Sequence, residues 1–229
     1  MKYLRKIDYD SYILELIKIS EDSNNVLVKN IGSSPKGRDI FKVSLDGGYD
    51  NILIVSGHHG DEIAAPMAIL NFIHEWKLLS EKPFNITLFP LINPDGYENG
   101  TRENSNSIDL NRQYSNTTEV EIKLVLENLN INYIAAFDFH EALDECAGFF
   151  CCESPQATTD LFDSESIVSR ISIKYPIARG GIVRNKNKEG SFRNFCDENE
   201  IYSLTFESPG QWEIRRRIEL LLFSLYSIL

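Results

Sequence analysis

Two histidines and two acids lie close together in the segment Asn51–Glu62, which reads NILIVSGHHGDE. An imidazole and a carboxylate three residues apart on a tight turn can reach one ion, so His59 and Glu62 are candidate metal ligands. A catalytic zinc takes three such protein ligands and keeps one position open. The segment therefore predicts a metal centre that needs one more ligand. His58 and Asp61 have the same spacing and are the competing pair.

Two later apolar runs also end at polar residues that could do chemistry. Tyr133–Phe139 runs into His140, and Ile201–Phe206 runs into Glu207. Short apolar runs are typical of strands buried on both faces of a parallel sheet, and such strands bring their carboxyl ends to one edge. His140 would complete a set of two histidines and one glutamate. Glu207 would remain as an acid beside the open position, suited to take a proton from water.

Two arginines lie in a polar segment, residues 99–115, that is rich in Asn, Ser and Arg. Polar loops of this length are uncommon in compact domains and are usually functional or disordered. A guanidinium suits a polarised carbonyl oxygen, and its fork binds a carboxylate through two hydrogen bonds. We therefore expect Arg102 and Arg112 to face the metal centre, with a structural salt bridge as the alternative for Arg112.

The elements that must position these residues alternate along the chain. Strands are expected at 26–30, 39–45, 51–56, 85–92, 133–139 and 201–206, with a short one at 148–152; helices are expected at 9–20, 61–79, 118–128, 160–175 and 212–229. Residues 93–96 are expected to form a turn, and residues 180–193 a basic loop. This pattern predicts an α/β fold, a three-layer α/β/α sandwich around a mixed, mainly parallel twisted sheet. The length of 229 residues suits a single domain over 1–229.

The composition excludes several classes of protein. A net charge of −11 argues against general binding to nucleic acid or anionic membranes. No run approaches the roughly 18 apolar residues of a membrane helix, and acids interrupt the N-terminal segment, so we expect a cytoplasmic location. The composition does not indicate the oligomeric state.

The four cysteines form no CxxC pair, and we expect them to be buried, reduced thiols.

Six motifs, all in family order, resemble the M14 zinc carboxypeptidase family, and the resemblance covers about residues 32–207. They are His59-x-x-Glu62, Asn93-Pro-Asp-Gly96, Arg102, Asp109-Leu-Asn-Arg112, Asp138-Phe-His140 and Thr205-Phe-Glu207. The resemblance implies a zinc carboxypeptidase-like fold and one Zn²⁺ ion bound by His59, Glu62 and His140.

The same resemblance implies roles for the other residues. Arg102 would stabilise the oxyanion, and Glu207 would activate water as the general base and then protonate the leaving amine. Asn111 and Arg112 would bind the free carboxylate of a peptide or acyl-amino-acid substrate.

Within that family, several features resemble the bacterial murein peptide amidases. The larger digestive members carry a tyrosine in a mobile loop shortly before the base, whereas Val183–Asn194 contains none. The short spacing between Glu62 and His140 and the motif Gly190-Ser-Phe192 point the same way. Murein peptide amidases are cytoplasmic enzymes that cleave the γ-D-glutamyl bond to meso-diaminopimelate in recycled cell-wall peptides.

Two other functions stay open at this point. An N-acyl amino acid deacylase, of the succinylglutamate desuccinylase and aspartoacylase type, shares the metal turn, the arginines and the late glutamate. The full Asn93-Pro-Asp-Gly96 motif favours the peptidase. A catalytically inactive, peptide-binding relative is the remaining alternative, but such proteins usually lack a zinc ligand or the base, and none is missing here.

Several charged residues have open interpretations. Asp138 could orient His140, as carboxylates commonly orient metal-bound imidazoles, or could be a satisfied acid at a strand end. Glu141 is interpreted as a loop acid, and Arg215–Arg217 as the solvent face of the last helix. The basic residues of the late loop form either a solvated surface or a rim that attracts an anionic substrate; they are Arg184, Lys186, Lys188 and Arg193.

Overall fold

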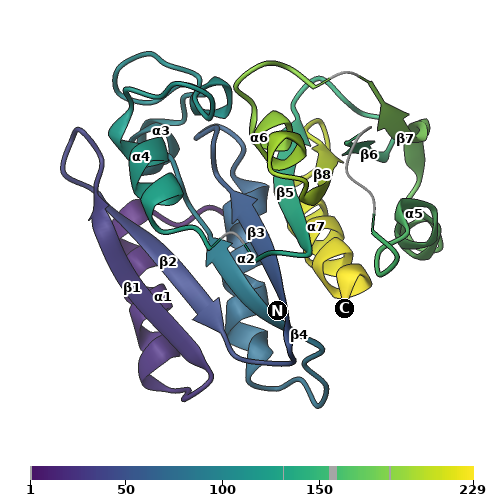
Figure 1. The fold of residues 1–229 in the computed structure, drawn as a ribbon, viewed down its shortest axis with the longest axis horizontal. Coiled ribbons are helices and arrows are strands. Elements are labelled where there is room, and N and C mark those ends of the chain that lie inside the picture. The colour runs from purple at the N-terminus through teal and green to yellow at the C-terminus, as the bar shows by residue number, and fades with distance from the viewer. Residues whose placement is uncertain (1, 131, 155–158, 186) are drawn as a thin grey trace.

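In the computed structural model, which describes residues 2–130, 132–154, 159–185 and 187–229, the strands form one eight-stranded sheet (Figure 1). The strands are β1 (Val26–Ser33), β2 (Asp39–Leu45), β3 (Asp50–Ser56), β4 (Phe84–Phe89), β5 (Ala135–Ala142), β6 (Phe149–Glu153), β7 (Ile177–Arg184) and β8 (Tyr202–Pro209). Their order across the sheet is β1-β2-β4-β3-β5-β8-β6-β7. The central strands β4, β3, β5 and β8 are mutually parallel. The mixed, mainly parallel sheet is therefore confirmed.

Helices cover both faces of this sheet. They are α1 (Tyr9–Glu21), α2 (Ala64–Trp76), α3 (Pro94–Asn99), α4 (Val120–Glu127), α5 (Ser164–Ser172), α6 (Phe192–Glu198) and α7 (Ile214–Ile228), with a 3₁₀ turn η1 (Leu110–Arg112). Successive residues of a strand point to opposite faces. Ile52 and Ile54 of β3 accordingly pack in a core with α1, α2, α5 and α7, whereas Leu53 and Val55 pack in a second core with α4 and α6. Two cores on one sheet confirm the three-layer sandwich.

The boundaries differ from the predicted ones where tertiary pairing extends or replaces a local pattern. Strands β5 and β8 continue past their apolar runs because they pair with each other as far as Ala142 and Pro209. Residues 93–96 begin helix α3 rather than a turn, since the Asn93 side chain accepts a hydrogen bond from the Gly96 N–H at 2.8 Å. Helix α2 begins at Ala64, after the Asp61-Glu62 pair.

The predicted basic loop, residues 180–193, is also wrong in part. Its first residues belong to β7, which pairs in parallel with β6 despite its glycines. Its last residues begin α6, which Ser191 caps by accepting a hydrogen bond from the Asn194 N–H.

The prediction of four buried cysteines is also wrong in part. All four thiols are free, but Cys146 is exposed in the connection between β5 and β6 and Cys152 is partly exposed. No helix in the described ranges is long and apolar enough to cross a membrane.

Candidate active site

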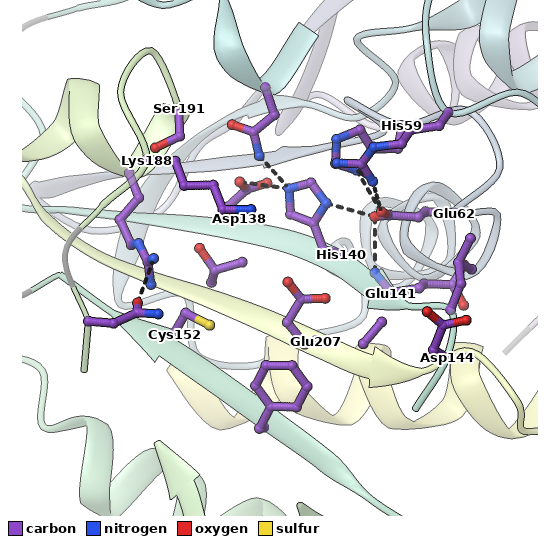
Figure 2. A pocket seen from close by; sticks show the side chains of 18 of the residues that line it. His59, Glu62, Asp138, His140, Glu141, Asp144, Cys152, Lys188, Ser191 and Glu207 are labelled. Carbon is purple, nitrogen blue, oxygen red and sulfur yellow. Dashed lines mark hydrogen bonds and ion pairs between the residues drawn. The ribbon is translucent and has the colours of Figure 1, made fainter. Parts of the chain in front are cut away.

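Three neighbouring strands place the candidate residues at one end of the sheet. β5 lies between β3 and β8, and His140 of β5 is the direct register partner of Glu207 of β8. β3 ends at Ser56, and Gly57 then turns the chain with a φ of 68° into the segment that carries His59 and Glu62. The sheet register thus sets the spacing of His140 and Glu207, and the turn after β3 brings the other two side chains beside them (Figure 2).

The carboxylate of Glu62 lies between the two imidazoles. Its Oε1 is 2.6 Å from His59 Nδ1, and its Oε2 is 2.7 Å from His140 Nδ1. The donor atoms of the three side chains all lie within 4.8 Å of one another. Two imidazoles and a carboxylate are a donor set that suits a divalent transition metal. These contacts suggest a metal site, whose residues are those that the sequence analysis selected.

Each imidazole is held through its other nitrogen by a carboxylate. His140 Nε2 lies 2.9 Å from Asp138 Oδ2, and His59 Nε2 lies 3.1 Å from Asp109 Oδ1. Such partners fix the orientation and tautomer of a ligating histidine. The geometry therefore favours the orienting interpretation of Asp138. Asp109 received no role from the sequence, although it begins the Asp109-Leu-Asn-Arg112 motif.

His58 does not join the contacts around Glu62. It is fully buried, its Nε2 lies 2.7 Å from the Tyr114 hydroxyl, and its Nδ1 lies 3.3 Å from Asp138 Oδ1. Its ring stacks on His140 with 5.5 Å between centroids. His58 thus lies against Asp138 on the side away from Glu62, and Tyr114 in turn holds His58. Spacing along the chain could not indicate this role.

The electrostatic environment separates the two glutamates of the site. Burial acts to raise the pKa of Glu62, but the adjacent His140 and His59 outweigh it and lower the pKa, which keeps the carboxylate ionised. Burial raises the pKa of Glu207 to about 7 despite the attraction of His140. A carboxyl group with a pKa near neutrality is suited to general acid–base chemistry.

These residues line a cavity of about 600 Å³, together with Arg102, Asn111 and Arg112. Arg102 Nη2 pairs with Asp109 Oδ2 at 3.0 Å, and its Nη1 lies 3.1 Å from His59 Nδ1. Asn111 Oδ1 accepts a hydrogen bond from the Phe192 N–H at 2.8 Å, which fixes the amide. Arg112 donates to the Asn111 carbonyl oxygen. Among the residues with described positions, no carboxylate pairs with Arg112, so the salt-bridge alternative finds no support.

The basic residues of the late segment divide into two groups. Lys188 and Arg193 line the cavity, whereas Arg184 pairs with Glu153 and Glu165. Lys186 lies outside the described residues.

The Gly190-Ser-Phe192 motif packs against the arginine loop, the segment 99–115 that carries Arg102 and Arg112. The Gly190 carbonyl oxygen accepts a hydrogen bond from the Tyr114 N–H at 2.9 Å. Gly190 has a φ of 70°, and an added Cβ would lie 2.4 Å from the Arg112 carbonyl oxygen, so only glycine fits here.

Gly60 gives a test of how the metal turn is supported. An added Cβ at Gly60 would lie 1.9 Å from the Gly96 carbonyl carbon, and Asn93 Nδ2 donates to the His58 carbonyl at 3.2 Å. The Asn93–Gly96 motif thus holds this turn. We expect Gly60→Ala to lower the free energy of unfolding by about 1–3 kcal/mol and to weaken metal binding at the cluster. Denaturant titration and chelator competition with Zn²⁺ as the probe ion measure the two effects.

Gly37→Ala is the control, because nothing lies within 4 Å of an added Cβ there; its φ of 82° adds backbone strain that Gly60 does not share, so this control tests strain without a clash. It is expected to leave Zn²⁺ affinity unchanged. Equal losses of affinity in both variants would contradict the role given to the Asn93–Gly96 motif.

Comparison with known proteins shows which family this chain belongs to. The family model described as the succinylglutamate desuccinylase/aspartoacylase catalytic domain matches residues 49–218. The chain belongs to this family. The match covers all seven predicted site residues, and the sequence analysis had placed this type of protein second. No curated protein sequence matches the chain.

Solved structures show the fold of this desuccinylase/aspartoacylase family member independently. A protein from Shewanella denitrificans OS217, described as a metallopeptidase, is 22% identical with a TM-score of 0.80, over 96% of this chain and 89% of that one. A metallo-carboxypeptidase from Burkholderia cenocepacia is 17% identical with a TM-score of 0.77, over 96% and 67%. Bovine thrombin-activatable fibrinolysis inhibitor is 17% identical with a TM-score of 0.76, over 100% and 97%.

These similarities confirm the zinc carboxypeptidase-like fold. The family match indicates a hydrolase of the desuccinylase/aspartoacylase type.

Proposed function

We propose that this family member is a zinc-dependent hydrolase that cleaves the amide bond of an amino acid carrying a free carboxylate. The observation that carries the proposal is one cavity that holds the His59–Glu62–His140 cluster, Glu207 and an arginine, Arg112, without a carboxylate partner among the described residues. The cluster would bind the metal, the glutamate would move protons, and the arginine would bind the substrate carboxylate.

The residues of the chain divide the reaction between them. When bound by His59, Glu62 and His140, a zinc ion would supply Lewis-acid polarisation of the scissile carbonyl. Glu207, with its pKa near 7, takes a proton from the attacking water and delivers it to the leaving nitrogen. Arg102 faces the same centre and stabilises negative charge that develops on the carbonyl oxygen.

The family match favours an acyl amino acid as the substrate. N-acetyl-aspartate and N-succinyl-glutamate are the first compounds to assay, with release of the free amino acid as the measured product. Deacylation without cleavage of short peptides would support this choice, and peptide cleavage without deacylation would reject it. No hydrolysis of any substrate by zinc-loaded protein would instead favour an inactive, peptide-binding relative.

Peptidase activity is the second candidate, favoured by the Asn93–Gly96 motif and the carboxypeptidase fold. The murein peptide amidase form of this proposal rests on the resemblance carried by the Gly190-Ser-Phe192 motif and the short spacing between Glu62 and His140. A γ-D-glutamyl-meso-diaminopimelate peptide, assayed beside an L-amino acid peptide, tests it. Release of diaminopimelate would support the narrower function, and cleavage of the L-peptide alone would exclude it.

Arg193 gives a prediction about the substrate side chain. Among the described residues its Nη1 is buried without a strong hydrogen-bond partner, its Nη2 donates to Asn185 Oδ1 at 3.3 Å, and its guanidinium interacts with the Cys152 thiol. A buried donor left unpaired is unfavourable, so a second anionic group of the substrate would satisfy it. We expect Arg193→Met to raise KM for N-succinyl-glutamate about 10-fold or more, with little effect on an N-acyl-alanine.

Arg184→Met is the control for this prediction, because that arginine pairs with Glu153 and Glu165 and does not line the cavity. A rise in KM that is equal for both substrates would show that Arg193 does not recognise the side chain.

A further inference from the structure

Glu141 and Arg217 form a buried ion pair beside the metal centre, contrary to both sequence-based interpretations. Glu141 belongs to β5 and is 3% exposed, so it is not a loop acid. The Arg217 side chain is 14% exposed, and its Nη1 donates to Glu141 Oε2 at 2.6 Å, so this part of α7 does not face solvent. The other oxygen of Glu141, Oε1, accepts a hydrogen bond from the Ala64 N–H at 2.6 Å.

The contact with Ala64 replaces a missing helix cap. Helix α2 begins at Ala64, and its N-cap residue, Ile63, makes no side-chain hydrogen bond. The first N–H groups of a helix have no partner within it, and a negative charge is favourable at that end. Glu141 supplies the missing acceptor from a different element. The start of α2 is thereby fixed against β5.

The same residue also holds the metal ligand Glu62. The backbone N–H of Glu141 donates to Glu62 Oε2 at 3.0 Å, and Glu62 lies two residues before Ala64. His140 directly precedes Glu141 in β5, and Ser208, the neighbour of Glu207, places its hydroxyl 3.4 Å from Glu141 Oε2. Figure 2 shows Glu141 beside Glu62 and below the two histidines.

We propose that the Glu141–Arg217 pair is a positioning device that holds the Glu62 carboxylate in place for the metal ion. The pair fixes the end of the metal turn at α2, while β3 fixes its beginning. Arg217 acts through Glu141 and does not line the cavity, since its Nη1 donates to Glu141 Oε2 and so orients the buried carboxyl group. The inference rests on the proposed function in one respect, namely that His59, Glu62 and His140 bind the ion.

The test measures the dissociation constants of Zn²⁺ and Co²⁺ by chelator competition in the full chain. Arg217→Met is expected to weaken binding of both ions about 10–100-fold, the range typical of partners behind a metal ligand. Arg217→Lys keeps the charge and is expected to restore part of the affinity. Arg216→Met is the matched control, because the Arg216 guanidinium lies over the Trp212 ring at 3.8 Å and away from Glu141. Its affinity should equal that of the parent protein.

A second pair of variants covers the case in which Arg217→Met fails to fold. Glu141→Gln and the double variant Glu141→Gln/Arg217→Met contain fewer buried charges, and an amide oxygen can still accept from Ala64. If Glu141 and Arg217 act through one shared contact, the Zn²⁺ dissociation constant of the double variant is no higher than that of the single variant with the lower affinity. Folded variants, judged by circular dichroism without metal, that bind Zn²⁺ with parental affinity would overturn the inference. A parent protein that binds neither ion would overturn the proposed metal centre itself.

Discussion

Replacement of Glu207 by glutamine is expected to lower kcat about 10³-fold or more while Zn²⁺ remains bound. Glutamine has nearly the same shape but cannot take a proton from water, and burial has raised the pKa of this carboxyl group to about 7. Glu207 makes no direct contact with Glu62 within the described structure, so the donor set of the cluster is unchanged by the replacement. Initial rates on the preferred substrate, together with the zinc content of the purified variant, measure both halves of the expectation.

Asp144→Asn is the matched control, because Asp144 also lines the cavity but is exposed. Its kcat is expected to stay close to that of the parent protein. If Glu207→Gln turned over substrate at the parental rate with zinc in place, another group would have to be the base.

The second large effect, a loss of Zn²⁺ affinity, is expected when Glu62 is replaced by glutamine. Its carboxylate contacts both His59 and His140 and accepts a hydrogen bond from the backbone N–H of Glu141. This one side chain thus connects the three residues of the cluster. Glu62→Gln removes the negative charge and turns one oxygen into a donor that faces an imidazole. We expect Zn²⁺ affinity to fall by more than about 100-fold, beyond the range for residues behind the ligands, and hydrolysis to be lost at micromolar zinc.

Asp109→Asn provides the comparison for Glu62→Gln, because Asp109 contacts His59 only through the nitrogen that faces away from Glu62. Its effect on Zn²⁺ affinity is expected to be about 10-fold. A larger loss for Asp109→Asn than for Glu62→Gln would reverse the assignment of ligand and support.

The sequence was sufficient for the parts of this site that local patterns specify. The unbroken apolar run before Ser56 and those that lead to His140 and Glu207 indicate buried parallel strands, and parallel strands bring such side chains to one edge. This argument selected residues that do line one cavity. Their chemical roles remain predictions until the variants above are measured.

Contacts that cross between elements could not be predicted in the same way. Glu141 resembles a loop acid because the apolar run ends before it, and only pairing with β8 extends the strand through Ala142. Its partner Arg217 stands 76 residues further on, in a run of three arginines that resembles a solvent-facing helix surface. Tyr114 supports His58 from a loop, where no periodicity exists. β7 was missed because its two glycines weaken the strand pattern, whereas pairing with β6 stabilises it.

The direct register of His140 with Glu207 has a consequence for how such a protein can change its substrate. Both residues lie on central strands with neighbours on each side, and regions of this kind open least often in the native state. Lys188, in the connection between β7 and α6, and Arg193, in the first turn of α6, reach the same cavity. Mutation can remodel that connection while the separation of the proposed base, Glu207, and the proposed metal ligand, His140, stays set by the backbone pairing of β5 with β8. In this fold, substrate selectivity can thus change by mutation without a change in the geometry of the catalytic residues.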